Sequence, residues 1–143
     1  MTAFKLVEAN RIIEGVFLEA SRVGLKPLSV AVLDTGGHVV AFQKQDGSSM
    51  LRFEIAVGKA YGALAVGFGS RWLEKAAVER PHFVAGLNAV SGGKIVPVPG
   101  GVLVRNNAGD LLGAVGVTGD TSDNDETVAV FGIAAADLQA QTE

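Results

Sequence analysis

Apolar residues recur along the chain with two different spacings, and these spacings predict its helices and strands. Leu6, Ala9 and Ile13 follow one another at intervals of three and four residues, which is typical of one face of a helix. Short β-branched runs bounded by glycine-rich turns predict strands instead. The pattern predicts helices over 2–24, 51–66, 70–80 and 122–138, and strands over 28–33, 39–42, 95–96, 102–105 and 111–117.

Tight turns between these strands predict an antiparallel sheet. Residues 34–37 separate the first two strands, and residues 106–110 separate the last two. The helices must then cover the sheet, which gives an α+β fold. A length of 143 residues without repeat or linker suits a single domain over 1–143.

The predicted helix over 51–66 is apolar on nearly all sides, so we expect burial on more than one face. Ala56, Ala60, Ala63 and Gly67 form a stripe of small residues along it. Only 19% of residues are charged and the mean hydropathy is +0.34, so a monomer would expose a large apolar patch. We expect a symmetric interface to cover that patch, through the small-residue stripe.

Charge and composition exclude several classes of protein. A net charge of -3 and a pI of about 5.4 provide no positive field for nucleic acid. The absence of cysteine excludes disulfides, thiolate metal sites and iron–sulfur clusters. Charged residues interrupt the first 15 positions, and no apolar run is long enough to span a membrane. We therefore expect a cytoplasmic protein with neither nucleic acid nor membrane as a partner.

The triplet Asp34-Thr35-Gly36 resembles the signature of aspartic proteases, which pair two such loops so that two carboxylates share a proton. Gly37 stands where those proteases carry Ala or Ser, and an opening helix does not suit their all-β barrel. A hairpin turn in which Asp34 accepts hydrogen bonds from nearby amides explains the triplet better.

Two side chains could support chemistry, and each also has a structural explanation. Lys59 is the only charge between Glu54 and Arg71 on an apolar helix. It could meet a substrate carboxylate or act as a base, or it could form a structural pair with Asp46 or Asp125. His38 begins a strand beside two glycines and could act as a base or metal ligand, or lie at the surface.

The remaining glycine and acidic clusters match no established motif. Gly100 and Gly101 could present amides to an anion, but no phosphate loop or dinucleotide fingerprint surrounds them. The acidic residues from Asp120 to Glu126 do not have EF-hand spacing. Their position at a helix start suits the helix dipole, with Ser122 and Asp125 as a capping box.

Several motifs in a fixed order resemble the GlcG/HbpS family, which also forms the C-terminal domain of PduO-type proteins. The resemblance covers nearly the whole chain and rests on residues 32–38 (VLDTGGH), 58–61 (GKAY), 92–97 (GGKIVP), 99–101 (PGG) and 113–119 (GAVGVTG), followed by Asp125-Glu126. It implies a profilin-like fold with a five-stranded antiparallel sheet flanked by helices. It also implies assembly as a homodimer or homo-octamer.

The family resemblance implies a protein that binds haem or a related tetrapyrrole. The first helix carries no histidine, which leaves His38 as the candidate axial ligand of the metal. We expect the ligand-binding residues to be His38, Lys59, Pro99, Gly100, Gly101 and Asp125, with Lys59 facing a carboxylate of the ligand.

The residues also allow a second function, that of a cofactor-independent isomerase, hydratase or lyase acting on a small oxo acid or aromatic catabolite. Lys59 would then anchor the substrate and His38 would transfer a proton. The amides of Gly100 and Gly101 would stabilise negative charge. Both functions require residues 38, 59 and 100 to meet in one hollow.

Overall fold

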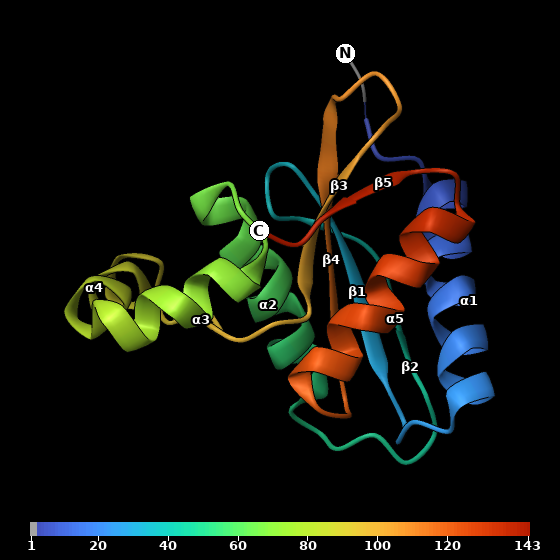
Figure 1. The fold of residues 1–143 in the computed structure, drawn as a ribbon, viewed down its shortest axis with the longest axis horizontal. Coiled ribbons are helices and arrows are strands. Elements are labelled where there is room, and N and C mark those ends of the chain that lie inside the picture. The colour runs from blue at the N-terminus through green and yellow to red at the C-terminus, as the bar shows by residue number, and fades with distance from the viewer. Residues whose placement is uncertain (1–2) are drawn as a thin grey trace.

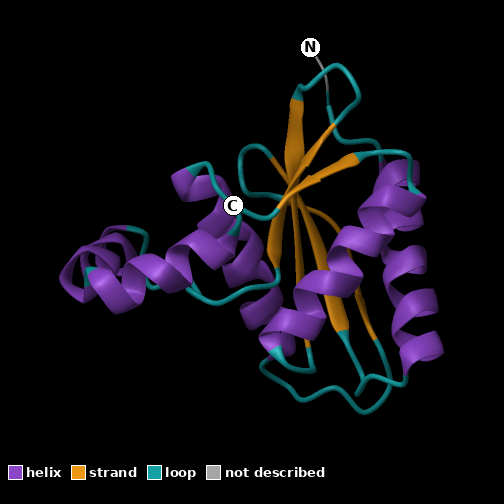
Figure 2. Ribbon diagram, in the orientation of Figure 1, coloured by secondary structure: helices purple, strands orange, loops and turns teal. Residues whose placement is uncertain are grey.

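The computed structural model describes residues 3–143 as five helices and five strands (Figures 1 and 2). In chain order these are α1 (Leu6–Val23), β1 (Ser29–Asp34), β2 (Val39–Lys44), α2 (Arg52–Val66), α3 (Ser70–Glu79), α4 (Pro81–Val90), β3 (Gly101–Arg105), β4 (Leu111–Thr118), α5 (Ser122–Ala135) and β5 (Gln139–Gln141). None of the helices in this part of the chain is long and apolar enough to cross a membrane.

The five strands form one antiparallel sheet in the order β2-β1-β4-β3-β5. In the central pair, Val30 of β1 lies opposite Val117 of β4, and Asp34 lies opposite Gly113. The α+β fold that the residue pattern predicts and the profilin-like five-stranded sheet that the family resemblance implies are therefore both confirmed.

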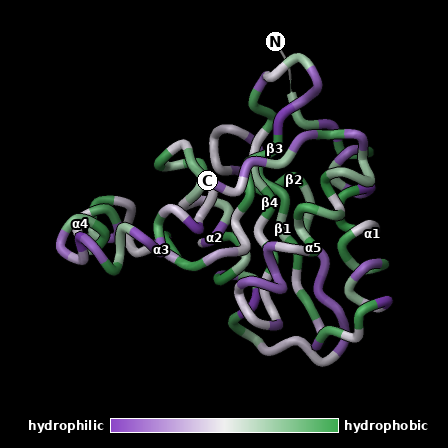
Figure 3. Tube along the Cα trace, viewed as in Figure 1, coloured by the Kyte–Doolittle hydropathy of each residue, from purple (hydrophilic) through white to green (hydrophobic). Residues whose placement is uncertain are grey.

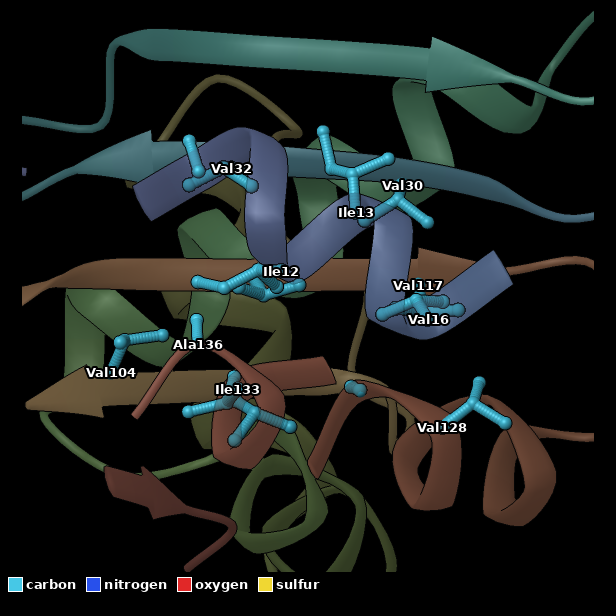
Figure 4. Packing of buried hydrophobic residues seen from close by; sticks show 14 of the residues in the cluster. Ile12, Ile13, Val16, Val30, Val32, Val104, Val117, Val128, Ile133 and Ala136 are labelled. Atoms are coloured by element: carbon cyan, nitrogen blue, oxygen red, sulfur yellow. The ribbon is translucent and has the colours of Figure 1, made fainter. Parts of the chain in front are cut away.

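The sheet has an apolar layer on each face because its buried strands carry apolar residues at consecutive positions. Figure 3 shows hydrophobic stretches, in green, along the central strands and α1. Val30 and Val117 belong to the larger core, which α1 and α5 complete with Ile12 and Ile133 (Figure 4). The alternate positions pack toward α2 in a smaller cluster that includes Leu33. The fold is thus a sheet between a helix pair and a single helix (Figure 1).

The helix α2 lies very close to the sheet through its small residues. Ala56, Ala60 and Ala63 are fully buried, and a Cβ on Gly116 of β4 would clash with the Ala56 carbonyl oxygen. The expectation that this stripe forms an interface between copies is therefore wrong for these three alanines, because the chain's own sheet covers them. The exposed side chains of α2 lie elsewhere on the helix.

The helices α3 and α4 form an arm that extends from the sheet (Figure 1). The base of the arm is fixed by Arg71, which donates to Asp123 and Glu126 of α5. The sequence pattern missed α4, because Pro81 was interpreted as the end of a helix. It instead occupies the first helical position, where a missing N–H costs nothing.

Two further expectations about elements are corrected. Residues 95–96 are not a strand: the Val96 amide donates to the carbonyl of Gly58 on α2 rather than to the sheet. The closing helix ends at Ala135 rather than 138, and Asp137, with a φ of 61°, reverses the chain into β5. The fifth strand therefore comes from the C-terminal end.

The helix starts also differ from the predicted caps. Thr2 lies outside the described residues, and α1 begins after Lys5, whose amide donates to Glu8. At α5 the cap is Thr121 rather than Ser122, since its hydroxyl accepts from the Asn124 amide. The Asp125 carboxylate therefore does not form the predicted capping box, and it accepts hydrogen bonds from Lys59 and the Asp120 amide instead.

Candidate functional site

The turn between β1 and β2 holds His38 through the side chain of Asp34. The Oδ1 atom of Asp34 accepts three hydrogen bonds: from the Gly36 amide at 2.9 Å, the His38 amide at 3.0 Å and His38 Nδ1 at 3.2 Å. These two amide bonds, that of His38 first, hold the pKa of Asp34 below its ordinary value. Asp34 is therefore an ionised acceptor at neutral pH.

An ionised carboxylate determines which nitrogen of the imidazole carries the proton. Because Asp34 only accepts, the Nδ1 of neutral His38 carries the hydrogen and donates it. The Nε2 atom then has a free lone pair, which is the arrangement of metal-binding histidines oriented by a carboxylate. The His38 side chain is 81% exposed, so a ligand can reach it.

A hollow of about 350 Å³ lies beside His38, and we call it the His38 hollow. Apolar walls come from Phe4, Val40 and Leu112, and polar ones from Asp34 and Thr35. This volume is at the lower end of the range for small-molecule sites. The hollow therefore combines an available imidazole nitrogen with apolar surface.

Glycine at position 36 leaves room for the observed position of the imidazole ring. A Cβ there would lie 2.8 Å from Cε1 and 2.9 Å from Nδ1 of His38. The next residue, Gly37, has a φ of +81° and lies against the ring of Tyr61. The turn sequence thus sets the position of the histidine ring.

Lys59 lies at the other end of the sheet in a buried ion pair with Asp125. Its Nζ donates to Asp125 Oδ2 at 3.1 Å and to the Val117 carbonyl oxygen at 2.9 Å. The two side chains are only 2% and 1% exposed. Of the two structural partners considered from the sequence, Asp125 is confirmed.

Burial dominates the electrostatics of this pair. Desolvation lowers the pKa of Lys59, and the charge of Asp125 opposes that shift. Desolvation also raises the pKa of Asp125, against the charge of Lys59 and the Asp120 amide that donates to it at 3.0 Å. Each charge is thus held in the interior mainly by the other.

Pro99, Gly100 and Gly101 are buried, and the two glycines lie against Lys59. A Cβ on Gly100 would lie 2.8 Å from Lys59 Nζ. The Gly101 amide donates to the Ser70 hydroxyl at 2.7 Å. That amide is consequently engaged within the fold and is not presented to a ligand.

The structure brings residues 59 and 100 together but places His38 apart from them within one chain. Asp34 lies opposite Gly113, whereas Lys59 Nζ bonds the carbonyl of Val117, four residues further along β4. At 3.3–3.4 Å per residue this separates the two sites by about 13 Å. The expected common hollow is therefore absent from the described chain, and with it the geometry that the cofactor-independent enzyme requires.

Sequence reasoning missed a groove between α2 and the segment after α4, which has a volume of about 470 Å³. Its apolar wall includes Leu51, Phe53, Val57 and Val96, while Glu54 and Lys94 also line it. We call this surface the α2 groove. The apolar residues at 51–57 were a signal for it, but which of them face solvent depends on tertiary packing.

Within residues 3–143, no group of three or more His, Cys, Asp or Glu is placed to hold a metal ion. One axial imidazole suits a metal that already has other ligands, such as a tetrapyrrole nitrogen set.

The family model described as "Haem degrading protein HbpS-like" matches residues 4–134. The chain belongs to the HbpS-like family. A 15.0 kDa uncharacterized protein of Citrobacter freundii from the dhaT-dhaS intergenic region is 30% identical over 124 residues, which are 87% of this chain and 85% of that protein.

Solved structures agree with the fold. The crystal structure of a PduOC:heme complex has a TM-score of 0.84 at 22% identity, covering 96% of this chain and 97% of that one. Klebsiella pneumoniae ORFY also has a TM-score of 0.84, at 24% identity, covering 95% and 92%. A Streptomyces reticuli HbpS double mutant has a TM-score of 0.80 at 26% identity, covering 94% and 87%.

Proposed function

We propose that this HbpS-like protein binds haem or a related metal-bearing tetrapyrrole, with His38 Nε2 as an axial ligand of the metal. The observation that carries the proposal is the hydrogen bond from His38 Nδ1 to the ionised carboxylate of Asp34 beside an apolar hollow. The family to which the chain belongs and the haem complex of its structural neighbour PduOC support the choice of ligand.

The residues around the His38 hollow could hold haem or a related tetrapyrrole. Asp34 fixes the tautomer and orientation of the imidazole. Phe4, Val40 and Leu112 supply the apolar part of the wall of the His38 hollow. Bound haem iron would supply one-electron and oxygen chemistry, tuned by its axial ligand.

Lys59 and Asp125 have a structural role in this proposal. The Lys59 ammonium already donates to Asp125 and Val117 and is shielded from solvent. Meeting a ligand carboxylate would require it to leave Asp125 uncompensated in the interior, which is costly. We therefore assign ligand binding to His38 alone among the residues proposed from the sequence.

Haem titration of matched histidine variants tests the proposal. Wild-type protein is expected to shift and intensify the Soret band with saturation, and His38→Ala is expected to lose that change. His82→Ala is the control, because His82 is the other histidine and lies exposed on α4; its affinity should stay within about twofold of wild type. An unchanged titration in His38→Ala would contradict the assignment.

We also propose that the chain self-associates. Large apolar side chains are exposed near the start of α2 and on the arm, including Met50 and Leu51 on one side and Val78 and Val90 on the other. Large apolar side chains that gather on an exposed surface mark interaction sites in soluble proteins. Sedimentation equilibrium at micromolar concentration should show a dimer or larger species, and a monomer would contradict this part of the proposal.

A further inference from the structure

The helix α4 is apolar and lacks a covering layer within one chain. Its ten residues include no Asp, Glu, Lys or Arg, yet only Val84 is buried. Among the described helices and strands it packs only against α3, and Figure 1 shows it at the far end of the arm. Val90 at its end is 86% exposed. Leaving such a helix in water forgoes the stabilisation that burial of its apolar side chains would give.

The α2 groove is a concave apolar surface at the base of the same arm. It is lined by Leu51, Phe53, Val57 and Val96, and its other edge includes Gly93 and Lys94, which follow α4 directly in the chain. Leu51 and Phe53 are 54% and 39% exposed. One chain therefore has a protruding apolar helix, α4, and an apolar groove, and residues 91–94 connect the helix to the edge of the groove.

Charges at the two surfaces are complementary. Glu54 and Lys94 line the groove, whereas Glu79 and Arg80 lie at the junction of α3 and α4. None of these four side chains forms a salt bridge with another of the described residues. The two cations instead lie over aromatic rings, Lys94 over Tyr61 and Arg80 over Phe83. Each surface thus offers one positive and one negative group to a partner.

We propose that α4 of one copy occupies the α2 groove of a second copy, and that the two copies exchange arms reciprocally. A reciprocal exchange about a two-fold axis would bury each arm in the groove of the other copy and so close the assembly. Arg80 then pairs with Glu54 across the interface, and Glu79 with Lys94. The inference rests on the proposed self-association and is independent of haem binding.

The first test changes the end of the arm. Val90→Asp leaves the monomer fold unaffected because Val90 is solvent-exposed in one chain, but it places a charge in the proposed interface. We expect the dimer dissociation constant, measured by sedimentation equilibrium without haem, to rise about tenfold or more. Leu18→Asp is the matched control: Leu18 is 69% exposed on α1, and its substitution should leave association unchanged.

The second test exchanges the charges. Arg80→Glu should weaken association severalfold by placing two carboxylates together, and adding Glu54→Arg to the same chain should restore most of it. Circular dichroism of each variant confirms that the fold is retained.

The outcomes separate the two proposals. If Val90→Asp leaves the dimer dissociation constant unchanged, the arm-in-groove contact is wrong while self-association stands. The same holds if Glu54→Arg does not restore the association that Arg80→Glu weakens. Weakening by Leu51→Asp, at an exposed position of the groove, without weakening by Val90→Asp means that something other than the arm fills the groove, and also overturns the arm-in-groove contact. A wild-type monomer overturns both.

Discussion

Two acid–base pairs, Asp34 with His38 and Lys59 with Asp125, lie at opposite ends of the same sheet and differ chiefly in their access to solvent. The Asp34–His38 pair has a histidine that is 81% exposed, whereas both members of the Lys59–Asp125 pair are at least 98% buried. Opposite environments produce opposite shifts: hydrogen bonds lower the pKa of Asp34, and desolvation raises the pKa of Asp125.

This difference shows which pair is available for chemistry. A buried ion pair with its hydrogen bonds satisfied has a structural role and cannot readily bind a ligand, because separating the pair leaves two uncompensated charges in an apolar interior. An exposed imidazole held by a carboxylate retains one free nitrogen. Both pairs contain residues that sequence motifs single out, so the distinction depends on tertiary structure alone.

The largest effect should follow from breaking the buried pair. Lys59→Met leaves Asp125 uncompensated, and we expect the free energy of unfolding in urea to fall by about 3–5 kcal/mol. Glu143→Gln, which breaks the exposed pair of Glu143 with Lys75, is the control and should change stability far less. Equal losses in the two variants would show that burial does not distinguish them.

The sequence predicted the parts of the fold in which local pattern and tertiary packing agree. The hairpin over 28–42 and the helix over 51–66 were recognised, because β-branched runs around a glycine turn and a long apolar segment have few alternative structures. The helix α4 was missed, since its apolar residues are not set against a polar face. The strand β5 was missed because Gln139–Gln141 is a polar edge strand, identified only by its pairing with β3.

The candidate site was only partly predictable. Sequence reasoning identified His38 and Lys59 as notable and Asp125 as one partner of Lys59, but it placed them in one hollow. The β1–β4 register separates them, and a register depends on how distant segments pair. The α2 groove was invisible for the same reason, because it lies between segments some 40 residues apart in sequence.

A smaller effect should follow from crowding the exposed pair. Gly36→Ala places a Cβ against the His38 ring, and its backbone needs no left-handed conformation, so we expect haem affinity to fall about tenfold, or 1.4 kcal/mol, with the fold retained. Gly86→Ala is the matched control, since a Cβ there meets no atom within 4 Å. Wild-type affinity in Gly36→Ala would show that haem does not depend on the placement of this ring.

The smallest expected effect is the change in stability as Asp34 and Asp125 take up protons at low pH. The lowered pKa of Asp34 means that its contribution to stability is present above the unfolded value of 3.8 and is lost as the pH falls through its folded pKa. The raised pKa of Asp125 has the opposite effect on stability. The folded state takes up that proton before the unfolded state does, so protonation of Asp125 as the pH falls favours the folded state. Carboxyl ¹³C NMR should show Asp125 titrating at higher pH than Asp34, with Asp34→Asn removing the lower transition. The reverse order would contradict the contrast between the pairs.

The most direct test of this contrast is the haem dissociation constant of two variants measured beside wild type. Replacing both members of the buried pair, as Lys59→Met with Asp125→Leu, removes its charges while keeping apolar volume, so the fold should persist. We predict haem affinity within about twofold of wild type in this double variant and loss of binding in His38→Ala. Haem binding that is lost in a folded double variant and retained in His38→Ala would contradict the account.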